Sequence, residues 1–242
     1  MISIVIPTLN ERQNIGKLFD SIFAQDTSEH IELIVADSHS TDGTRELVES
    51  YRGKFKTLQI VEGGLPAKAR NNGGRAASGE ILLFMDADIA LPDRAFLEKN
   101  LLYFRSHKLV VASVLFRAES IHWFDHALTR ASNLAIRLLK YIHPLGSMCI
   151  VVSRDVFLKS GGYPEDRVMA EDHDFVARCT RFGRFDLLPM PIEFSVRRFD
   201  EEGRLTVVWK YILVTLHIIF VGPVTKPLFE YKFKHTEKEK GS

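Results

Sequence analysis

The chain has 242 residues, of which 45% are hydrophobic and 26% charged, and its net charge is +1 at pH 7. This length suits one large domain or two small ones, and the composition is ordinary for a globular protein. The small net charge, without a basic aromatic sheet face, argues against nucleic-acid binding.

The first residues predict a strand rather than a targeting segment. Residues 2–6 form a run rich in β-branched residues, which is typical of a strand. The charged region followed by an apolar stretch that marks a secretory signal is not found there. A cytoplasmic location is therefore the expectation. The two cysteines, Cys149 and Cys179, have no metal-ligand spacing, so we expect buried free thiols, with a disulfide as the alternative.

The first half of the chain alternates strand and helix patterns. Strands are predicted over residues 2–6, 31–36, 58–61, 81–85 and 110–116, and helices over 11–25, 44–52, 67–77 and 92–105. Asn10 is expected to cap the first helix, and Thr41 or Asp42 the second. The alternation predicts an α/β fold with a largely parallel sheet and right-handed crossovers.

The second half begins with a long amphipathic pattern over residues 121–142. Its polar strip consists of His122, His126, Arg130, Asn133, Arg137 and Lys140. This strip either faces solvent or faces phospholipid head groups or a phosphorylated acceptor. Strands over 148–152 and 187–194, a helix from Glu171 to Cys179 and a loop over 195–203 are predicted next.

Residues 205–221 are mostly apolar and are followed by Gly222 and Pro223. As a helix they would span about 25 Å, less than the roughly 30 Å of a hydrocarbon core. The stretch also contains Lys210 and His217. We favour a helix lying in the membrane interface, with a spanning helix or one packed on the domain as alternatives. The basic tail, 226–240, suits an anionic membrane surface or disorder.

Acidic side chains follow the predicted strands. Asp86 and Asp88 come directly after the apolar run 81–85, and Asp37 follows the second strand. In open α/β sheets, ligands bind at the carboxyl edge of the strands. Oxygen ligands suit hard divalent cations, so the pair predicts a metal that holds the phosphates of a nucleotide.

Two further clusters favour catalysis. Glu171 and Asp172 open a predicted helix, where the helix dipole favours negative charge, and one of them could act as a general base. The alternative is a pair of acids that only stabilises the helix. Arg197 and Arg198 form a basic pair that follows the last predicted strand.

Jointly, these segments resemble the inverting family 2 glycosyltransferases of the GT-A fold over roughly residues 1–205. The matching segments are Ser3–Glu11, Asp37, Ser40–Thr44, Ala69–Asn71, Ser78–Glu80, Asp86–Asp88 and Glu171–Asp172. The opening also resembles polyprenyl-phosphate mannose synthases, although Ala90 stands where these often carry a polar ligand. Ser195–Phe199 replaces the Gln-x-x-Arg-Trp of processive synthases, which argues against a processive polymerase.

The resemblance implies a Rossmann-like, mixed and mostly parallel sheet flanked by helices. It implies a catalytic domain over residues 1–204, with a nucleotide-binding half over about 1–116 and an acceptor half over about 117–204. Residues 205–242 would form a membrane-associating amphipathic helix and a basic tail.

The resemblance also assigns roles to single residues. Asp172 would be the catalytic base and Glu171 would position the acceptor. Asp88, with Asp86, would bind Mn²⁺ or Mg²⁺. The residues expected to bind the nucleotide are Pro7, Leu9, Glu11, Asp37, Arg70, Asp86, Arg197 and Arg198.

The expected activity is metal-dependent, inverting transfer of a sugar from a UDP- or GDP-linked donor. The expected acceptor is lipid-linked, at the cytoplasmic face of the membrane. A polyprenyl-phosphate sugar synthase is an alternative. A sugar-phosphate nucleotidyltransferase is less favoured because residues 7–16 contain one glycine, Gly16, and no phosphate loop. A non-catalytic sugar-nucleotide-binding module is another alternative. It is disfavoured by the presence of both Asp88 and Asp172, because binding alone needs no base.

Overall fold

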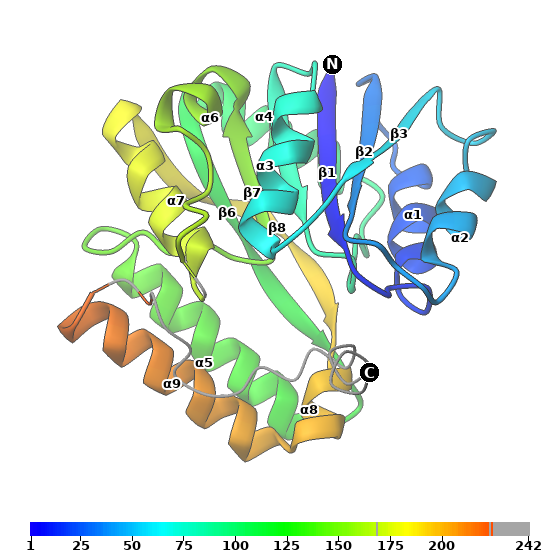
Figure 1. Cartoon of the computed structure of the whole chain (residues 1–242). Helices are drawn as coiled ribbons and strands as arrows, with labels where there is room; N and C mark the ends of the chain where they lie inside the picture. The colour runs from blue at the N-terminus through cyan, green and yellow to red at the C-terminus, as the bar shows by residue number, and fades with distance from the viewer. Residues whose placement is uncertain (168, 223, 225–242) are drawn as a thin grey trace, which may run out of the picture.

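The computed structural model describes residues 1–167, 169–222 and 224. In this part of the chain, one sheet lies at the centre and helices cover both of its faces (Figure 1). The strands are β1 (Ile2–Thr8), β2 (Ile31–Asp37), β3 (Thr57–Glu62), β4 (Ile81–Met85), β5 (Ile89–Ala90), β6 (Leu109–Glu119), β7 (Cys149–Ser153) and β8 (Arg184–Ser195). The helices are α1 (Ile15–Phe23), α2 (Thr44–Ser50), α3 (Pro66–Ala76), α4 (Phe96–Ser106), α5 (Trp123–Leu139), α6 (Arg154–Ser160), α7 (Glu171–Cys179), η1 (Thr180–Phe182), α8 (Arg197–Glu202) and α9 (Arg204–Phe220).

The sheet is mixed, with the strand order β3-β2-β1-β4-β7-β6-β8-β5. β1 lies parallel to β2 and β4, and β2 lies parallel to β3. β7 is antiparallel to both β4 and β6, whereas β6 and β8 are parallel. The predicted mixed, mostly parallel α/β sheet is therefore confirmed.

Two hydrophobic clusters lie on opposite faces of the sheet. Alternate residues of each strand belong to different clusters. Ile4 and Ile6 pack toward α1, α2 and α4, whereas Val5 packs toward α3, α6 and α7. Because both faces are covered, the central strands are continuous apolar runs rather than alternating ones. Cys149 and Cys179 are buried free thiols in these clusters, as predicted.

Several local predictions were wrong at the helix ends. α1 begins at Ile15 with Asn14 at its N-cap, and Asn10 lies outside the helix in a left-handed conformation with φ 57°. The Asn10 side chain instead accepts a hydrogen bond from the Thr41 N–H at 2.7 Å, joining two loops. α2 is preceded by left-handed Gly43. The short helices α6 and α8 were not predicted, and α8 occupies the expected loop after residue 195.

α5 confirms the predicted long helix. The polar strip was expected to face solvent, phospholipid head groups or a phosphorylated acceptor, but two of its residues face the sheet instead. Asn133 and Lys140 face the sheet, whereas Arg130 and Arg137 are exposed. Asn133 donates to the Phe116 carbonyl at 2.7 Å and accepts from its N–H. The β6–β8 register shifts between Val114 and Phe116, so the Phe116 backbone needs a side-chain partner.

α9 follows α8 and has 17 residues. Along the described residues, none of the helices combines the length and apolar character needed to cross a bilayer. The predicted basic tail lies outside the described residues beyond Val224.

Candidate active site

The predicted donor side of the site lies where β1, β2 and β4 end. Thr8 is in register with Asp37 and Val5 with Phe84, and Pro7 and Asp86 each follow two residues after the Val5–Phe84 pair. From β1 the chain continues to β2 on one side and later returns to β4 on the other. A crevice forms at such a switch point, and ligands of α/β sheets bind there.

Arg70 on α3 joins the D-x-D strand to the start of α7. Its guanidinium donates to Asp86 Oδ1 and to Glu171 Oε1, both at 2.7 Å. The Arg70 side chain is 13% exposed. Burial opposes its charge, but the Asp86 and Glu171 carboxylates outweigh burial and raise the Arg70 pKa. Residues from three distant segments thus form one charged network.

Glu171 and Asp172 occupy the first turn of α7. Burial raises the pKa of Glu171, an effect that Arg70 opposes and that Asp172 and Asp86 reinforce. Asp172 is 24% exposed, and its Oδ1 accepts the His173 N–H at 2.9 Å. Ala170, just before them, has a φ of 57°. Non-glycine residues in this strained backbone conformation are concentrated at functional sites.

Gly146 backs the candidate base from the loop after α5, a role that we did not predict. A Cβ at this position would lie 2.7–2.8 Å from backbone and side-chain atoms of Asp172. The Gly146 N–H also donates to His173 Nδ1 at 3.0 Å. The residues Pro144–Ser147 carry no sign of this long-range contact in the sequence.

Asp88 and Arg197 are brought together by β5 and β8. The Ser195 N–H donates to the Asp88 carbonyl at 3.0 Å, and the Arg197 N–H donates to Ser195 Oγ. Burial raises the pKa of Glu11, and the charge of Arg197 lowers it while that of Asp86 raises it. The sheet pairing therefore gathers carboxylates and an exposed arginine at one edge.

Asp37 is 1% exposed and fixes the loop after β2. Its Oδ1 accepts hydrogen bonds from Thr8 Oγ1 at 3.1 Å and Ser40 Oγ at 2.6 Å, and Arg45 lies 3.6 Å from Oδ2. Thr8 and Ser40 lie in the segments that carry the family resemblance, but no role was predicted for their hydroxyl groups. A direct contact between Asp37 and a nucleotide stays a prediction.

The other predicted nucleotide residues differ in how far the structure describes them. Pro7 and Leu9 are half-buried at this edge of the sheet. The Arg198 backbone belongs to α8, but its side chain lies outside the description.

The carboxylates fit a divalent cation that takes ligands from its substrate as well. Within residues 1–167, 169–222 and 224, no three His, Cys, Asp or Glu side chains gather in a way that could hold a metal alone. Oδ1 of Asp86 accepts a hydrogen bond from Arg70. Asp88 follows two residues later in the sequence. Mg²⁺ commonly binds one or two carboxylates together with substrate phosphates and water.

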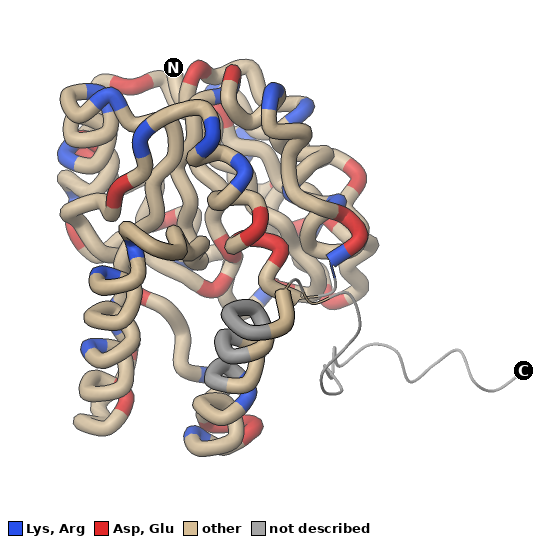
Figure 2. Tube along the Cα trace, turned by 90° about the vertical axis from the view of Figure 1, so that its left-hand side faces the viewer, with Lys and Arg blue, Asp and Glu red and all other residues tan. Residues whose placement is uncertain are grey.

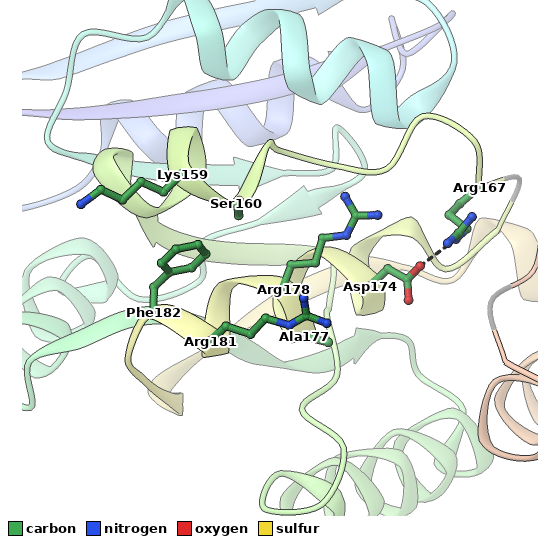
Figure 3. A pocket seen from close by; sticks show the side chains of 8 residues that line it. All are labelled: Lys159, Ser160, Arg167, Asp174, Ala177, Arg178, Arg181 and Phe182. Atoms are coloured by element: carbon green, nitrogen blue, oxygen red, sulfur yellow. Dashed lines mark hydrogen bonds and ion pairs between the residues drawn. The ribbon is translucent and has the colours of Figure 1, made fainter.

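A separate hollow of about 580 Å³ lies at α6, α7 and η1 (Figure 3). Arg178 and Arg181 line it, as do Arg167 and Asp174, and Arg167 donates a hydrogen bond to Asp174 at 2.7 Å. None of the predicted site residues lines this hollow.

Comparison with known proteins decides the family. The family model described as "Glycosyl transferase family 2" matches residues 3–187 of the chain. The chain belongs to glycosyl transferase family 2. The family segment includes both carboxylates of the D-x-D and the Glu171–Asp172 pair, so the predicted enzyme class is confirmed.

Relatives match the family 2 domain over part of their length. Poly(ribitol-phosphate) beta-N-acetylglucosaminyltransferase TarS of Staphylococcus aureus is 39% identical over 90 residues, which is 36% of this chain and 16% of TarS. An uncharacterized glycosyltransferase of Haemophilus influenzae is 25% identical over 187 residues, which is 74% of this chain and 61% of that protein. The chain thus spans less than two thirds of these relatives.

Solved structures confirm the GT-A fold. TarS residues 1–349 of S. aureus in complex with UDP-GlcNAc superpose with a TM-score of 0.65 at 22% identity, covering 80% of this chain and 58% of that one. The mannosyltransferase PcManGT from Pyrobaculum calidifontis, in complex with GDP-Man and Mn²⁺, gives 0.65 at 24% identity, covering 80% and 56%.

Proposed function

We propose that this family 2 enzyme transfers a sugar from a nucleoside-diphosphate donor to a lipid-linked acceptor, with inversion at the anomeric carbon. The donor is UDP- or GDP-linked, and a divalent cation assists its departure. The proposal depends most on the Arg70 network, because it joins the D-x-D strand to Glu171 through two 2.7 Å hydrogen bonds. This network supports placing the donor-side carboxylates in one site with the first turn of α7, which carries the candidate base.

The residues divide the work between donor and acceptor. Asp88, with Asp86, would hold the Mn²⁺ or Mg²⁺, and bound metal supplies Lewis-acid stabilisation of the departing diphosphate. Arg197 adds positive charge on the same side. Asp172 takes the proton from the attacking acceptor hydroxyl. Glu171, fixed by Arg70, positions the acceptor beside it.

Two comparisons support the donor class and the metal. The TarS complex holds UDP-GlcNAc, and the PcManGT complex holds GDP-Man with Mn²⁺. Both share the fold of this chain, in which β2 and β4 flank β1 on opposite sides, and an α/β sheet binds a nucleotide at such a switch point.

A thermal-shift screen tests the donor side of the proposal. At about 100 times its dissociation constant, UDP or GDP with Mn²⁺ is expected to raise the melting temperature by about 5–10 °C. The same nucleotide with EDTA should give a clearly smaller shift, and AMP serves as the unmatched ligand. If neither UDP nor GDP raises the melting temperature with metal present, the proposed donor is wrong.

Gly146→Ala tests whether the loop after α5 sets the position of the base. The new methyl group would sit 2.7–2.8 Å from Asp172 atoms, so Asp172 must move. A displacement near 1 Å is expected to lower kcat by about 10–100-fold, with the nucleotide-induced thermal shift retained. The matched control is Gly53→Ala, because a Cβ there meets nothing within 4 Å. Equal kcat in both variants would contradict this role.

A further inference from the structure

The polar face of α5 packs against the rest of the protein. A surface helix of a globular protein usually packs with its apolar face instead. Asp125, buried completely, accepts two hydrogen bonds from Arg204 at 2.8 and 3.0 Å. Asn133 binds the Phe116 backbone, and Lys140 donates to Asp186 at 2.7 Å. At about 100° per residue, these three side chains share one side of the helix.

The apolar side of α5 therefore faces outward. Leu134 is 57% exposed and Leu138 67% exposed, and Trp123 on the same stripe is more exposed still. Ten of the sixteen large apolar side chains exposed at the described surface lie within 121–142 or 205–221. Soluble proteins seldom leave so large an apolar concentration uncovered, and surfaces of this kind mark interaction sites.

α9 starts beside α5 and also carries exposed apolar side chains. It begins at the Arg204–Asp125 ion pair, so both helices start from one point, and Figure 2 shows them projecting from the same side of the body. Among its described side chains, Leu205, Trp209 and Leu213 are exposed.

The charge around these helices identifies the partner. Neither 126–154 nor 203–229 contains an Asp or Glu. Arg130 and Arg137 are exposed along one edge of the apolar stripe. A second copy docked on this face would bring the arginines of both chains to one apolar seam, whereas anionic lipid offers phosphates beside acyl chains.

We propose that α5 and α9 form a platform that docks on an anionic lipid bilayer, with Leu134, Leu138 and Trp209 among the acyl chains and Arg130 and Arg137 on lipid phosphates. Exposed Trp123 and Trp209 suit the interface, where tryptophan is enriched. The platform itself does not depend on the proposed function.

The platform also leads to the candidate base, and this part of the inference rests on the proposed function. The loop after α5 carries Gly146, which packs on Asp172. Beyond α9, Val224 pairs with Met169, two residues before Glu171. Both helices thus return to the first turn of α7, so docking would bring a lipid-linked acceptor to Asp172.

The two tryptophans of the chain, Trp123 and Trp209, both lie on the platform and report docking directly. We expect vesicles of phosphatidylcholine with one third phosphatidylglycerol to shift their emission to shorter wavelength and to carry the full chain upward in a flotation gradient. Leu134→Glu with Leu138→Glu should lower the bound fraction at least about tenfold. Arg130→Gln with Arg137→Gln should weaken binding about tenfold on these vesicles and leave binding to pure phosphatidylcholine unchanged.

Leu102→Glu is the matched control, because Leu102 is 67% exposed on α4, outside the platform; it should float like wild type. Failure of the wild type to float, or equal flotation of the α5 double variant, would overturn the proposal. A lipid-free wild-type dimer that the double variant dissociates would assign the face to a second copy instead. Nucleotide-induced thermal shifts, measured in parallel, test the donor site separately.

Discussion

Asp172→Asn is expected to lower the rate of sugar transfer to a hydroxyl acceptor by about 10²–10⁴-fold, the usual contribution of a positioned general base. The amide keeps the size of the side chain and can still accept the His173 N–H that Asp172 Oδ1 receives at 2.9 Å. It cannot take a proton. We therefore expect the fold and the nucleotide-induced thermal shift to be retained, with the loss confined to kcat.

Asp174→Asn is the matched control for this variant. Asp174 lies on the same helix, is 28% exposed and pairs with Arg167 at 2.7 Å on the side of the separate hollow. The control should retain transfer within a few-fold of wild type. Wild-type turnover by Asp172→Asn would remove Asp172 from the role of base. A loss of equal size in both variants would indicate a structural effect on α7.

Asp88→Ala should abolish metal-dependent activity, with a loss of at least about 10²–10³-fold, the range for removing one charge-stabilising group. The physical reason is that the proposed cation would then have only Asp86 as a protein ligand, and Oδ1 of Asp86 already accepts a hydrogen bond from Arg70 at 2.7 Å. The variant should bind nucleotide with an affinity that no longer responds to Mn²⁺. Calorimetric titration of Mn²⁺ in the presence of nucleotide measures this directly.

Asp155→Asn provides the control, since Asp155 is an exposed partner of Lys159 on α6, away from the sheet edge. It should show wild-type metal dependence. If Asp88→Ala retained an unchanged Mn²⁺ titration, the cation would not be held by the D-x-D. Asp88→Asn separates charge from size: it should fail like alanine if the carboxylate charge is what binds the metal.

The local sequence was sufficient for the elements whose signal is continuous. The run 81–85 predicted β4 because a strand buried on both faces must be apolar throughout. Glu171 predicted the start of α7 at the correct residue, because acids favour the first turn. The short helices α6 and α8 were missed, since six or seven residues give too little periodicity to stand out.

The family and the enzyme class followed from the order of short motifs along the chain, and the comparisons confirmed both. The roles of single residues in catalysis and metal binding stay predictions. The structure adds contacts that bear on them: it places Arg70 between Asp86 and Glu171 and Gly146 against Asp172.

The sequence by itself determined the α/β fold, the carboxylates at the strand ends and the amphipathic character of 121–142, because each depends on residues close in the chain. Only the tertiary structure decided which side of α5 faces inward. Hydrophobic periodicity predicts a buried apolar side, but the irregular backbone at Phe116 and the charge of Asp186 need polar partners, which Asn133 and Lys140 supply. Those long-range needs turned the apolar side of the helix outward.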